Sequence, residues 1–145
     1  MQHYLDLLNE EQRAAVEHEG SPLLILAAAG SGKTRVITTK IAYLISQKNI
    51  EPWQILSVTY TKKAANEMRR RAVEIEQRAA DAQIRTFHSF GSWFLRKYAD
   101  ECGLVPSFTI YDDDDMAVLL KKAVPSLSTK EVKVVAHQIS LAKDY

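Results

Sequence analysis

The hydrophobic positions of this chain follow two kinds of pattern, and the first passes directly into the second. Residues 23–29 are an unbroken series of Leu, Ile and Ala, which ends in the small residues 30–32. From residue 33 to residue 47, apolar side chains recur at three- and four-residue intervals. An unbroken run is typical of a buried strand, and the wider spacing is typical of an amphipathic helix. This stretch therefore predicts a strand, a tight loop and a helix that packs on a sheet.

The same succession occurs twice more. Residues 55–60 are rich in β-branched and aromatic side chains, and a helical pattern begins at residue 61. Residues 84–86 are a short third strand candidate, followed over residues 87–95 by an aromatic-rich helix whose rings we expect mainly in the core. Strands that alternate with helices predict an α/β fold, here a parallel sheet of about three strands flanked by helices.

Beyond residue 102 the pattern becomes helical. An extended segment at residues 108–111 leads into helical patterns over residues 116–123 and 129–143, which are separated at Pro125. We predict two parts, a first domain over residues 1–105 and a small helical segment over residues 106–145.

An acidic run, residues 112–115, precedes the first of these helices. A strand followed by Asp is also the arrangement that holds Mg²⁺ in phosphate-loop enzymes. However, Thr109 and Tyr111 are atypical of a fully buried strand, and Asp112 is well placed to accept the first free N–H groups of the helix. Capping is the favoured interpretation, and a magnesium ligand is the alternative.

Composition adds constraints. The chain has 145 residues, a formal net charge of +1, 46% hydrophobic and 26% charged residues, an ordinary globular balance. The single cysteine, Cys102, cannot form an intramolecular disulfide, and we expect it to be a partly buried thiol in a reducing compartment. No apolar run is long enough to span a membrane, and the amino terminus lacks a cationic signal region. These features predict a soluble, cytoplasmic protein.

Candidate chemistry is concentrated where the first apolar run ends. The phosphate-loop pattern G-x-x-x-x-G-K-[ST] is met at Gly32, Lys33 and Thr34, with Ala27 where the first glycine would stand. Main-chain amides around the glycines and the following helix start can surround an anion. Lys33 would reach the β- and γ-phosphates and Thr34 would bind Mg²⁺. The alternative is a simple tight turn, which would not require Lys-Thr after the glycine.

Two further stretches carry open alternatives. Asn9 and Gln12 have the spacing of a capping box at the start of an N-terminal helix, which would explain Gln12 without any ligand. Residues 61–71 hold five Lys or Arg against one Glu, in a chain that is nearly neutral. Such a run is usually a solvated helix face. Because hydroxyls and a ring precede it at residues 59–61, it also predicts a groove for nucleic acid.

Taken together, these stretches resemble the amino-terminal part of the UvrD/Rep/PcrA family of superfamily 1 DNA helicases. The resemblance rests on four stretches in the family's order, and the tail resembles the start of the family's helical insertion. They are residues 8–12 with Ala15 (the Q motif), residues 27–34 (the phosphate loop), residues 59–68 (motif Ia), residues 86–89 (motif Ib), and residues 108–112 and 139–143 in the tail.

The resemblance implies a RecA-like domain that binds ATP and Mg²⁺. Lys33 and Thr34 would be the catalytic residues of this chain, Gln12 would read the adenine edge, and Arg35 would lie against the adenine ring. The nucleotide contacts would be Gln12, Ala27, Ala28, Ala29, Gly30, Ser31, Gly32, Lys33, Thr34 and Arg35. Single-stranded DNA would contact Thr59, Tyr60, Thr61, Lys62, Thr86 and His88. The family usually has Phe at Tyr60, Asn at Lys62 and often Gly at Ala28.

By the same resemblance the parent protein would be an ATP-dependent 3′-to-5′ DNA helicase or translocase. The 145 residues contain no aspartate-glutamate Walker B pair on an aliphatic strand, no arginine-finger motif and no second RecA-like domain. We expect a fragment with little activity, whose uncovered sheet edge favours self-association. The alternatives are a naturally short module that binds nucleotide and DNA without catalysis, and a small phosphate-loop kinase.

Overall fold

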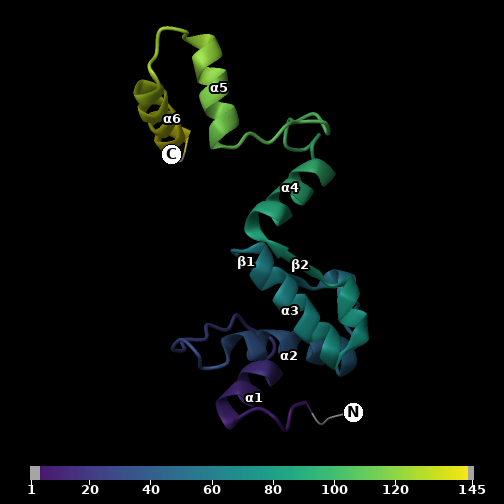
Figure 1. Ribbon diagram of the computed structural model, residues 1–145. Helices are drawn as coiled ribbons and strands as arrows, with labels where there is room; N and C mark the ends of the chain where they lie inside the picture. Colours follow the sequence, from purple (N-terminus) through teal and green to yellow (C-terminus); the bar gives the residue numbers. More distant parts are fainter. Residues whose placement is uncertain (1–3, 144–145) are drawn as a thin grey trace. The chain divides into compact units, whose positions relative to one another are not determined.

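The computed structural model describes residues 4–143, and its main chain divides into two compact units at residues 94 and 95. Figure 1 follows the elements in chain order. They are α1 (Glu10–Glu17), α2 (Lys33–Ser46), η1 (Pro52–Gln54), β1 (Leu56–Thr59), α3 (Lys62–Ile75), η2 (Gln77–Asp81), β2 (Gln83–Thr86), α4 (Phe87–Lys97), α5 (Asp113–Ala123) and α6 (Thr129–Lys143). The division lies within α4, so the predicted boundary at residue 105 stays a prediction.

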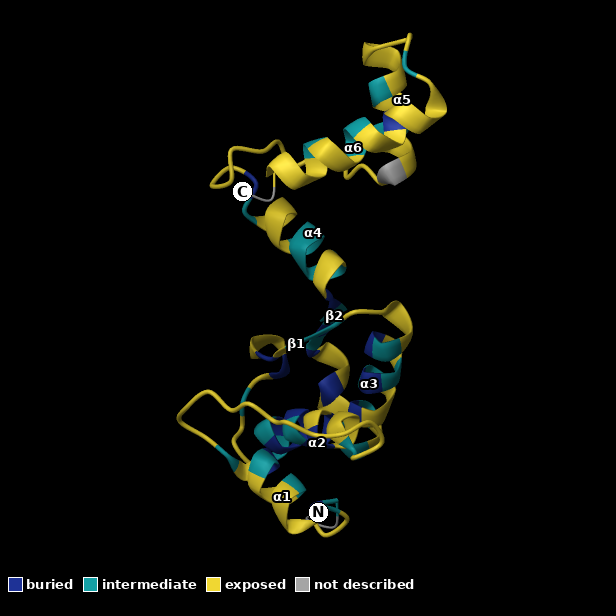
Figure 2. Ribbon diagram, turned by 90° about the vertical axis from the view of Figure 1, so that its left-hand side faces the viewer, coloured by how far each residue is buried: buried dark blue, intermediate teal, exposed yellow. Residues whose placement is uncertain are grey.

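The core of the first unit lies between α2, α3 and the strands. Ile41 and Ile45 of α2 pack with Met68 and Ala72 of α3 and with Ile84 of β2. These residues follow the three- and four-residue spacing that places apolar side chains on one helix face. The buried positions on facing sides of α2 and α3 are visible in dark blue in Figure 2. The predicted helix over residues 33–47 is confirmed, since α2 occupies all but its last residue.

The sheet of the described chain has two strands, not three. β1 and β2 are parallel neighbours, with Leu56 opposite Gln83 and Thr59 opposite Thr86. The strand predicted before the phosphate loop is absent: residues 22–28 are irregular. The architecture is therefore mixed, with helices around a small parallel sheet, and the expectation of about three strands is wrong for the described residues.

The missing strand has a physical cause. Residues 23–27 make no main-chain hydrogen bond within the described part of the chain, and Leu24 and Leu26 are 80% and 85% exposed. A helix satisfies its own N–H and C=O groups, whereas a strand needs a neighbour on at least one side. β1 and β2 pair with each other, so the apolar run before the loop stays irregular and open to water.

Helix α1 is attached to α2 by a second, smaller core. Val16 packs with Leu5, Val36 and Tyr43. The ammonium of Lys40 donates to the main-chain oxygen of Val16 at 2.7 Å, where α1 ends. A cation at this end of a helix satisfies carbonyls that have no partner within the helix. Burial lowers the pKa of Lys40, and the nearby Glu19 opposes that shift.

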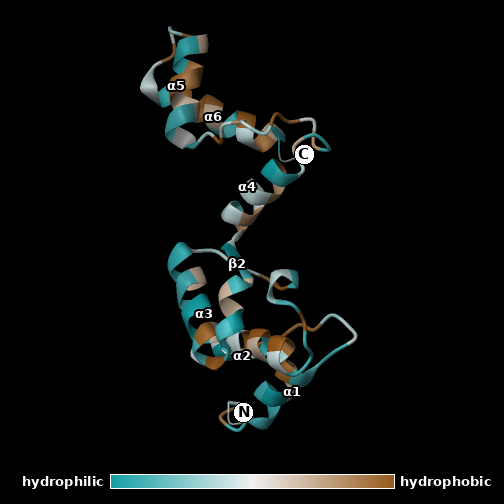
Figure 3. Ribbon diagram, turned by 90° about the vertical axis from the view of Figure 1, so that its right-hand side faces the viewer, coloured by the Kyte–Doolittle hydropathy of each residue, from teal (hydrophilic) through white to brown (hydrophobic). Residues whose placement is uncertain are grey.

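The second unit contains the paired helices α5 and α6. The Asp112 carboxylate accepts the N–H of Asp115 at 2.8 Å and the two residues form a capping box, so the favoured capping interpretation is confirmed. Val132 of α6 is buried, and brown apolar positions are visible on both helices in Figure 3.

We find no helix in the described chain that is long and apolar enough to cross a membrane.

Two expectations about burial are wrong. Cys102 is exposed rather than partly buried, because it lies in the turns that follow α4. None of the residues of α4 is buried, and Phe87 is 51% exposed. The rings of this helix instead pack on one another, with the centroid of Phe90 lying 5.9 Å from those of Trp93 and Phe94. The aromatic residues of α4 led to the prediction that this helix lies in the core, but none of the described elements covers its rings enough to bury them.

Candidate functional site

The predicted phosphate loop, residues 27–34, leads from the irregular, exposed segment into the first turn of α2. Gly30 and Gly32 have positive φ angles of 79° and 89°, a region that side chains disfavour. Gly32 is also the residue before the first turn of α2, so its conformation sets the direction in which the helix starts. A Cβ atom at Gly32 would lie 2.7 Å from the Gln12 side-chain nitrogen. The backbone conformation therefore requires glycine at this position, and a larger residue would also displace the Gln12 amide from the loop.

The Lys33 side chain lies against its own loop. Its ammonium donates to the main-chain oxygens of Ala27 at 2.8 Å and Ala28 at 2.6 Å. These carbonyls belong to the unpaired segment, so Lys33 supplies hydrogen bonds that strand neighbours would otherwise make. A phosphate that enters the loop would compete with the two carbonyls for the same ammonium.

Gln12 serves the helix cap and the loop at once. Its Oε1 accepts the N–H of Asn9 at 3.2 Å, and Asn9 accepts the N–H of Gln12 at 2.8 Å, which completes the predicted capping box. Its Nε2 donates to the main-chain oxygen of Ser31 at 3.0 Å. The capping box thus holds the Gln12 amide at the phosphate loop.

One cavity of about 470 Å³ gathers most of the predicted nucleotide residues. Its lining consists of Gln12, Gly30, Ser31, Gly32, Lys33, Thr34, Arg35 and Arg71. The three predicted alanines, 27–29, are outside this lining. Arg71 was predicted only as part of the basic run on α3, since no local pattern indicates which residue of one helix faces the start of another.

The lining suits a polyphosphate with its magnesium ion. Lys33, Arg35 and Arg71 supply three positive charges, and no Asp or Glu stands among the described lining residues. Thr34 offers one hydroxyl oxygen, and Mg²⁺ takes most of its ligands from water and substrate phosphates. Residues 4–143 hold no group of three or more His, Cys, Asp or Glu that could bind a metal. Among the described lining residues, Ser31 and Thr34 carry hydroxyl oxygens that could ligate such an ion.

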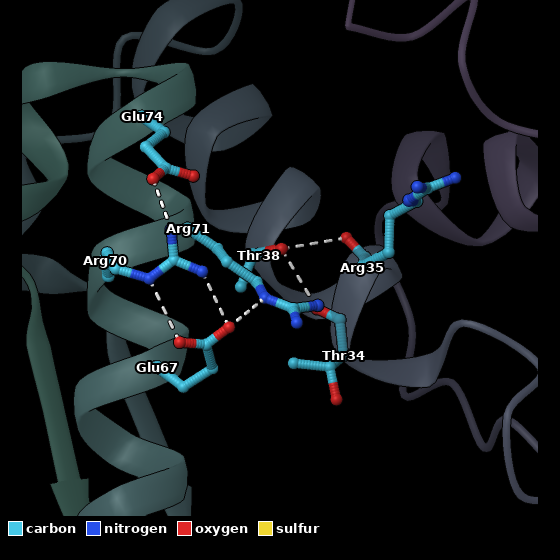
Figure 4. A network of polar contacts seen from close by, with 7 residues as sticks. All are labelled: Thr34, Arg35, Thr38, Glu67, Arg70, Arg71 and Glu74. Atoms are coloured by element: carbon cyan, nitrogen blue, oxygen red, sulfur yellow. Dashed lines mark hydrogen bonds and ion pairs between the residues drawn. The ribbon is translucent and has the colours of Figure 1, made fainter.

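Figure 4 shows how α3 meets α2 beside this cavity. The Glu67 carboxylate accepts from Arg70 at 2.7 Å and from Arg71 at 2.6 Å, and Arg70 also pairs with Glu74. Hydrogen bonds from Arg70, then from Arg71, lower the pKa of Glu67 to about 2. The Thr38 hydroxyl donates to the main-chain oxygens of Thr34 and Arg35 within the first turns of α2.

The predicted DNA residues lie at the carboxyl ends of the two strands. Because Thr59 and Thr86 are opposite one another, the residues that follow them meet at one edge of the sheet. The ring centroids of Tyr60 and Phe87 are 5.4 Å apart, and Tyr60 is 87% exposed. The rings of residues 87–95 were expected mainly in the core, whereas Phe87 belongs to this surface.

Two of the hydroxyls at this edge already have partners. The Thr61 hydroxyl accepts the N–H of Ala64 at 3.1 Å, and the Thr86 hydroxyl accepts that of Ser89 at 3.1 Å. Both are helix caps, and Thr86 is only 7% exposed. Lys62 and His88 are exposed. The side chains most available to a ligand here are thus the two rings, Lys62 and His88.

The basic run on α3 divides into structural and open positions. Arg69 donates to the main-chain oxygens of Ala80 at 2.8 Å and Ile84 at 2.9 Å, which ties α3 to β2 and its approach. Arg70 and Arg71 pair with Glu67. The solvated-face interpretation thus accounts for Arg70, whereas Lys62 remains open at the strand edge.

The sequence matches the family described as "UvrD/REP helicase N-terminal domain" over residues 8–144. This match covers nearly the whole chain, and the protein belongs to that family. The resemblance inferred from the four sequence stretches is confirmed.

Several curated relatives are similar to the chain. A relative from Mycoplasma capricolum named "Probable DNA helicase II homolog" is 50% identical over 121 residues, which are 83% of this chain and 17% of the relative. The ATP-dependent DNA helicase PcrA of Leuconostoc citreum is 42% identical over 143 residues, 94% of this chain and 19% of the relative. The ATP-dependent DNA helicase UvrD1 of Mycobacterium bovis is 50% identical over 119 residues, which are 81% of this chain and 15% of the relative. The chain thus spans less than a fifth of the length of each.

Proposed function

We propose that this chain supplies the nucleotide-binding loop and part of the DNA path of an ATP-dependent helicase that moves 3′ to 5′ on single-stranded DNA. The observation that carries the proposal is the shared cavity of Gln12, Lys33 and Thr34 at the start of α2. Support comes from relatives whose names state ATP-dependent DNA helicase activity. The direction of movement rests on the family resemblance.

Each residue of the cavity has a proposed task. The amides of the loop and of the first turn of α2 would surround the phosphates, where the positive end of the helix favours an anion. Lys33 would exchange its carbonyl partners for the β- and γ-phosphate oxygens, and Thr34 would ligate Mg²⁺. Gln12 would hold the adenine edge while Arg35 lies against the ring. Hydrolysis of the phosphoanhydride bond between the β- and γ-phosphates of bound ATP, to ADP and phosphate, would drive movement in the parent protein.

The strand edge would bind the DNA. Tyr60 would stack on a base, as aromatic rings do in single-strand complexes, and Lys62 would neutralise a phosphate. His88 would extend the path along β2. Thr59, Thr61 and Thr86 would place these groups, since the last two hold the starts of α3 and α4.

The chain by itself would bind both ligands weakly and hydrolyse little ATP. The same proposal assigns residues 1–105 to part of a RecA-like motor domain and residues 106–145 to the start of a helical insertion. Its place of action would be the cytoplasm, where the DNA of a bacterial relative lies.

Calorimetric titration of Mg·ATP into the chain tests the nucleotide half of the proposal. We expect weak binding that Lys33→Ala reduces by about tenfold or more, since a charge-assisted hydrogen bond is worth roughly 1.5–3 kcal/mol. Lys122→Ala on α5 is the matched control. If Lys33→Ala and the unsubstituted chain bind Mg·ATP equally well, the loop does not bind the phosphates and the nucleotide half of the proposal fails.

Salt dependence of oligonucleotide binding tests the DNA half. For Z phosphate contacts, the slope of log affinity against log salt is about −0.7Z for single strands. We expect Lys62→Ala to make this slope shallower by about one contact, and Lys122→Ala to leave it unchanged. A slope that Lys62→Ala does not alter would assign Lys62 to a solvated face.

A further inference from the structure

The cavity at the phosphate loop has one wall from a helix that the loop sequence does not predict. The cavity is lined by Gln12, by residues 30–35 and by Arg71 of α3. Arg71 is thus separated in sequence from the loop and joined to it by the packing of α3 on α2. That packing is fixed by buried contacts of Met68 and Ala72 with Ile41 and Ile45.

Glu67 holds Arg71 in a defined place. Glu67 lies one turn before Arg71 on α3, and its carboxylate accepts a hydrogen bond from the Nε–H of Arg71 at 2.6 Å. Arg70 binds the same carboxylate from the neighbouring position, at 3.0 Å and 2.7 Å. Figure 4 shows the Arg71 side chain reaching from α3 towards the Thr34 end of α2. An arginine held through Nε keeps its two terminal nitrogens available for a second partner.

The other cations of the cavity are already engaged. Lys33 donates to Ala27 and Ala28, and Arg35 reaches the main-chain oxygen of Leu7 at 3.5 Å. Within residues 4–143, Arg71 binds Glu67 through Nε, and its two terminal nitrogens make no hydrogen bond or ion pair. A planar guanidinium with two parallel N–H groups matches the oxygens of a phosphate in geometry and charge.

We propose that Arg71 binds the phosphates of the nucleotide through its two terminal nitrogens, and that Glu67 is the positioning residue that holds it there. The proposal rests on the proposed function, because it takes the cavity to be the nucleotide site. It adds a contact from α3, the helix whose first turn lies at the DNA edge. One helix thus supplies Lys62 for DNA and Arg71 for nucleotide.

Binding of Mg·ATP, inorganic tripolyphosphate and adenosine to the whole chain tests this assignment by calorimetry and competition. Arg71→Gln is expected to weaken ATP and tripolyphosphate by about tenfold, the value of one charge-assisted hydrogen bond, and to leave adenosine unchanged. Arg71→Lys keeps the positive charge but not the planar pair of N–H donors, and we expect it to weaken ATP binding by about threefold. Arg70→Gln is the matched control, since Arg70 shares Glu67 but does not line the cavity, and a change below about twofold is expected.

Glu67→Gln separates positioning from direct contact. It leaves the Arg71 side chain intact but removes the charge that orients it, so a smaller loss than in Arg71→Gln is expected, for ATP and tripolyphosphate alike. Circular dichroism and thermal unfolding confirm that each variant is folded. A variant that is not folded is replaced by Arg71→Met, which keeps the length of the side chain.

The results distinguish this inference from the function beneath it. If ATP binding depends on Lys33 but Arg71→Gln and Arg70→Gln behave alike, Arg71 belongs to the helix surface and the inference is overturned. If Arg71→Gln weakens adenosine as much as ATP, Arg71 contacts the base side, which also overturns it. If Lys33→Ala binds ATP as well as the unsubstituted chain does, the proposed function fails, and the inference fails with it.

Discussion

Two stretches that both contain Leu and Ile differ in burial in this molecule. In α2, Ile41 and Ile45 are buried against α3 and the strands. A few residues earlier in the chain, Leu24 and Leu26 are almost fully exposed. The helix closes its own hydrogen bonds and needs only a packing surface, whereas the extended run needs a neighbouring strand before its side chains can be buried. Hydrophobicity alone therefore does not decide what is buried; main-chain hydrogen bonding does.

The strongest test of this contrast is truncation of the buried helix residue. Ile45→Ala is expected to lower the free energy of unfolding by about 2–5 kcal/mol, through lost burial and the cavity left behind. Leu26→Ala, at the exposed run, is expected to change it by about 0.5 kcal/mol or less. Urea unfolding of both variants gives the comparison. Equal losses would mean that the run is buried in solution.

The exposed run also predicts association between chains. Unpaired extended main chain and an open parallel sheet are templates for pairing with a second copy. Burial of a few hundred Å² of apolar surface is worth several kcal/mol, at about 25 cal/mol per Å². Light scattering should show mass rising with concentration, and the double variant Leu24→Lys, Leu26→Lys should reduce it. Leu119→Lys on α5 controls for charge, and a strictly monomeric chain would contradict the expectation.

A smaller effect separates structural from exposed arginines on α3. Arg69→Met removes hydrogen bonds to the main chain of Ala80 and Ile84 and leaves those carbonyls short of a partner. We expect a loss of about 1–3 kcal/mol in the free energy of unfolding. Arg70→Met, on an exposed ion pair, should cost clearly less. Chemical denaturation of the two variants decides, and equal costs would mean that the contacts of Arg69 are replaced by water.

The smallest expected effect concerns pH. The folded-state pKa of Glu67, about 2, is below its ordinary value of 4.5, because Arg70 and Arg71 bind the carboxylate. Its contribution to stability is therefore present above about pH 4.5 and is lost as the pH falls towards 2. The difference in thermal midpoint between Glu67→Gln and the unsubstituted chain should shrink between pH 6 and pH 3. A difference that stays constant over this range would contradict the assigned cause.

Local signals made much of this fold predictable. The capping residues Asn9 and Asp112 and the helical spacing of α2 depend on neighbours in the sequence, and all three are confirmed. The strand predicted from the apolar run at residues 23–29 was wrong, because the stability of a strand depends on neighbouring strands that a local pattern does not reveal. Cys102 and the rings of α4 were misplaced for the same reason, since burial is a property of the whole arrangement.

The candidate site divides in the same way. The loop at Gly32, Lys33 and Thr34 could be found from spacing, and the Gln12 contact with Ser31 joins it to the capping box. Arg71 and Phe87 could not be assigned, because their neighbours come from other elements. Their positions depend on the crossing of α3 over α2 and on the register of β1 with β2.

The open run at residues 23–27 has a consequence for the integrity of the chain. Irregular, solvent-exposed main chain is where endoproteases cut most readily, and here it is the covalent link between α1 and α2. A cut there would not by itself release α1, because Val16 stays packed on Val36 and Tyr43 and the Lys40 ammonium still holds the end of the helix. The nicked protein would persist as two peptides that remain associated, with Gln12 on one fragment and the phosphate loop on the other.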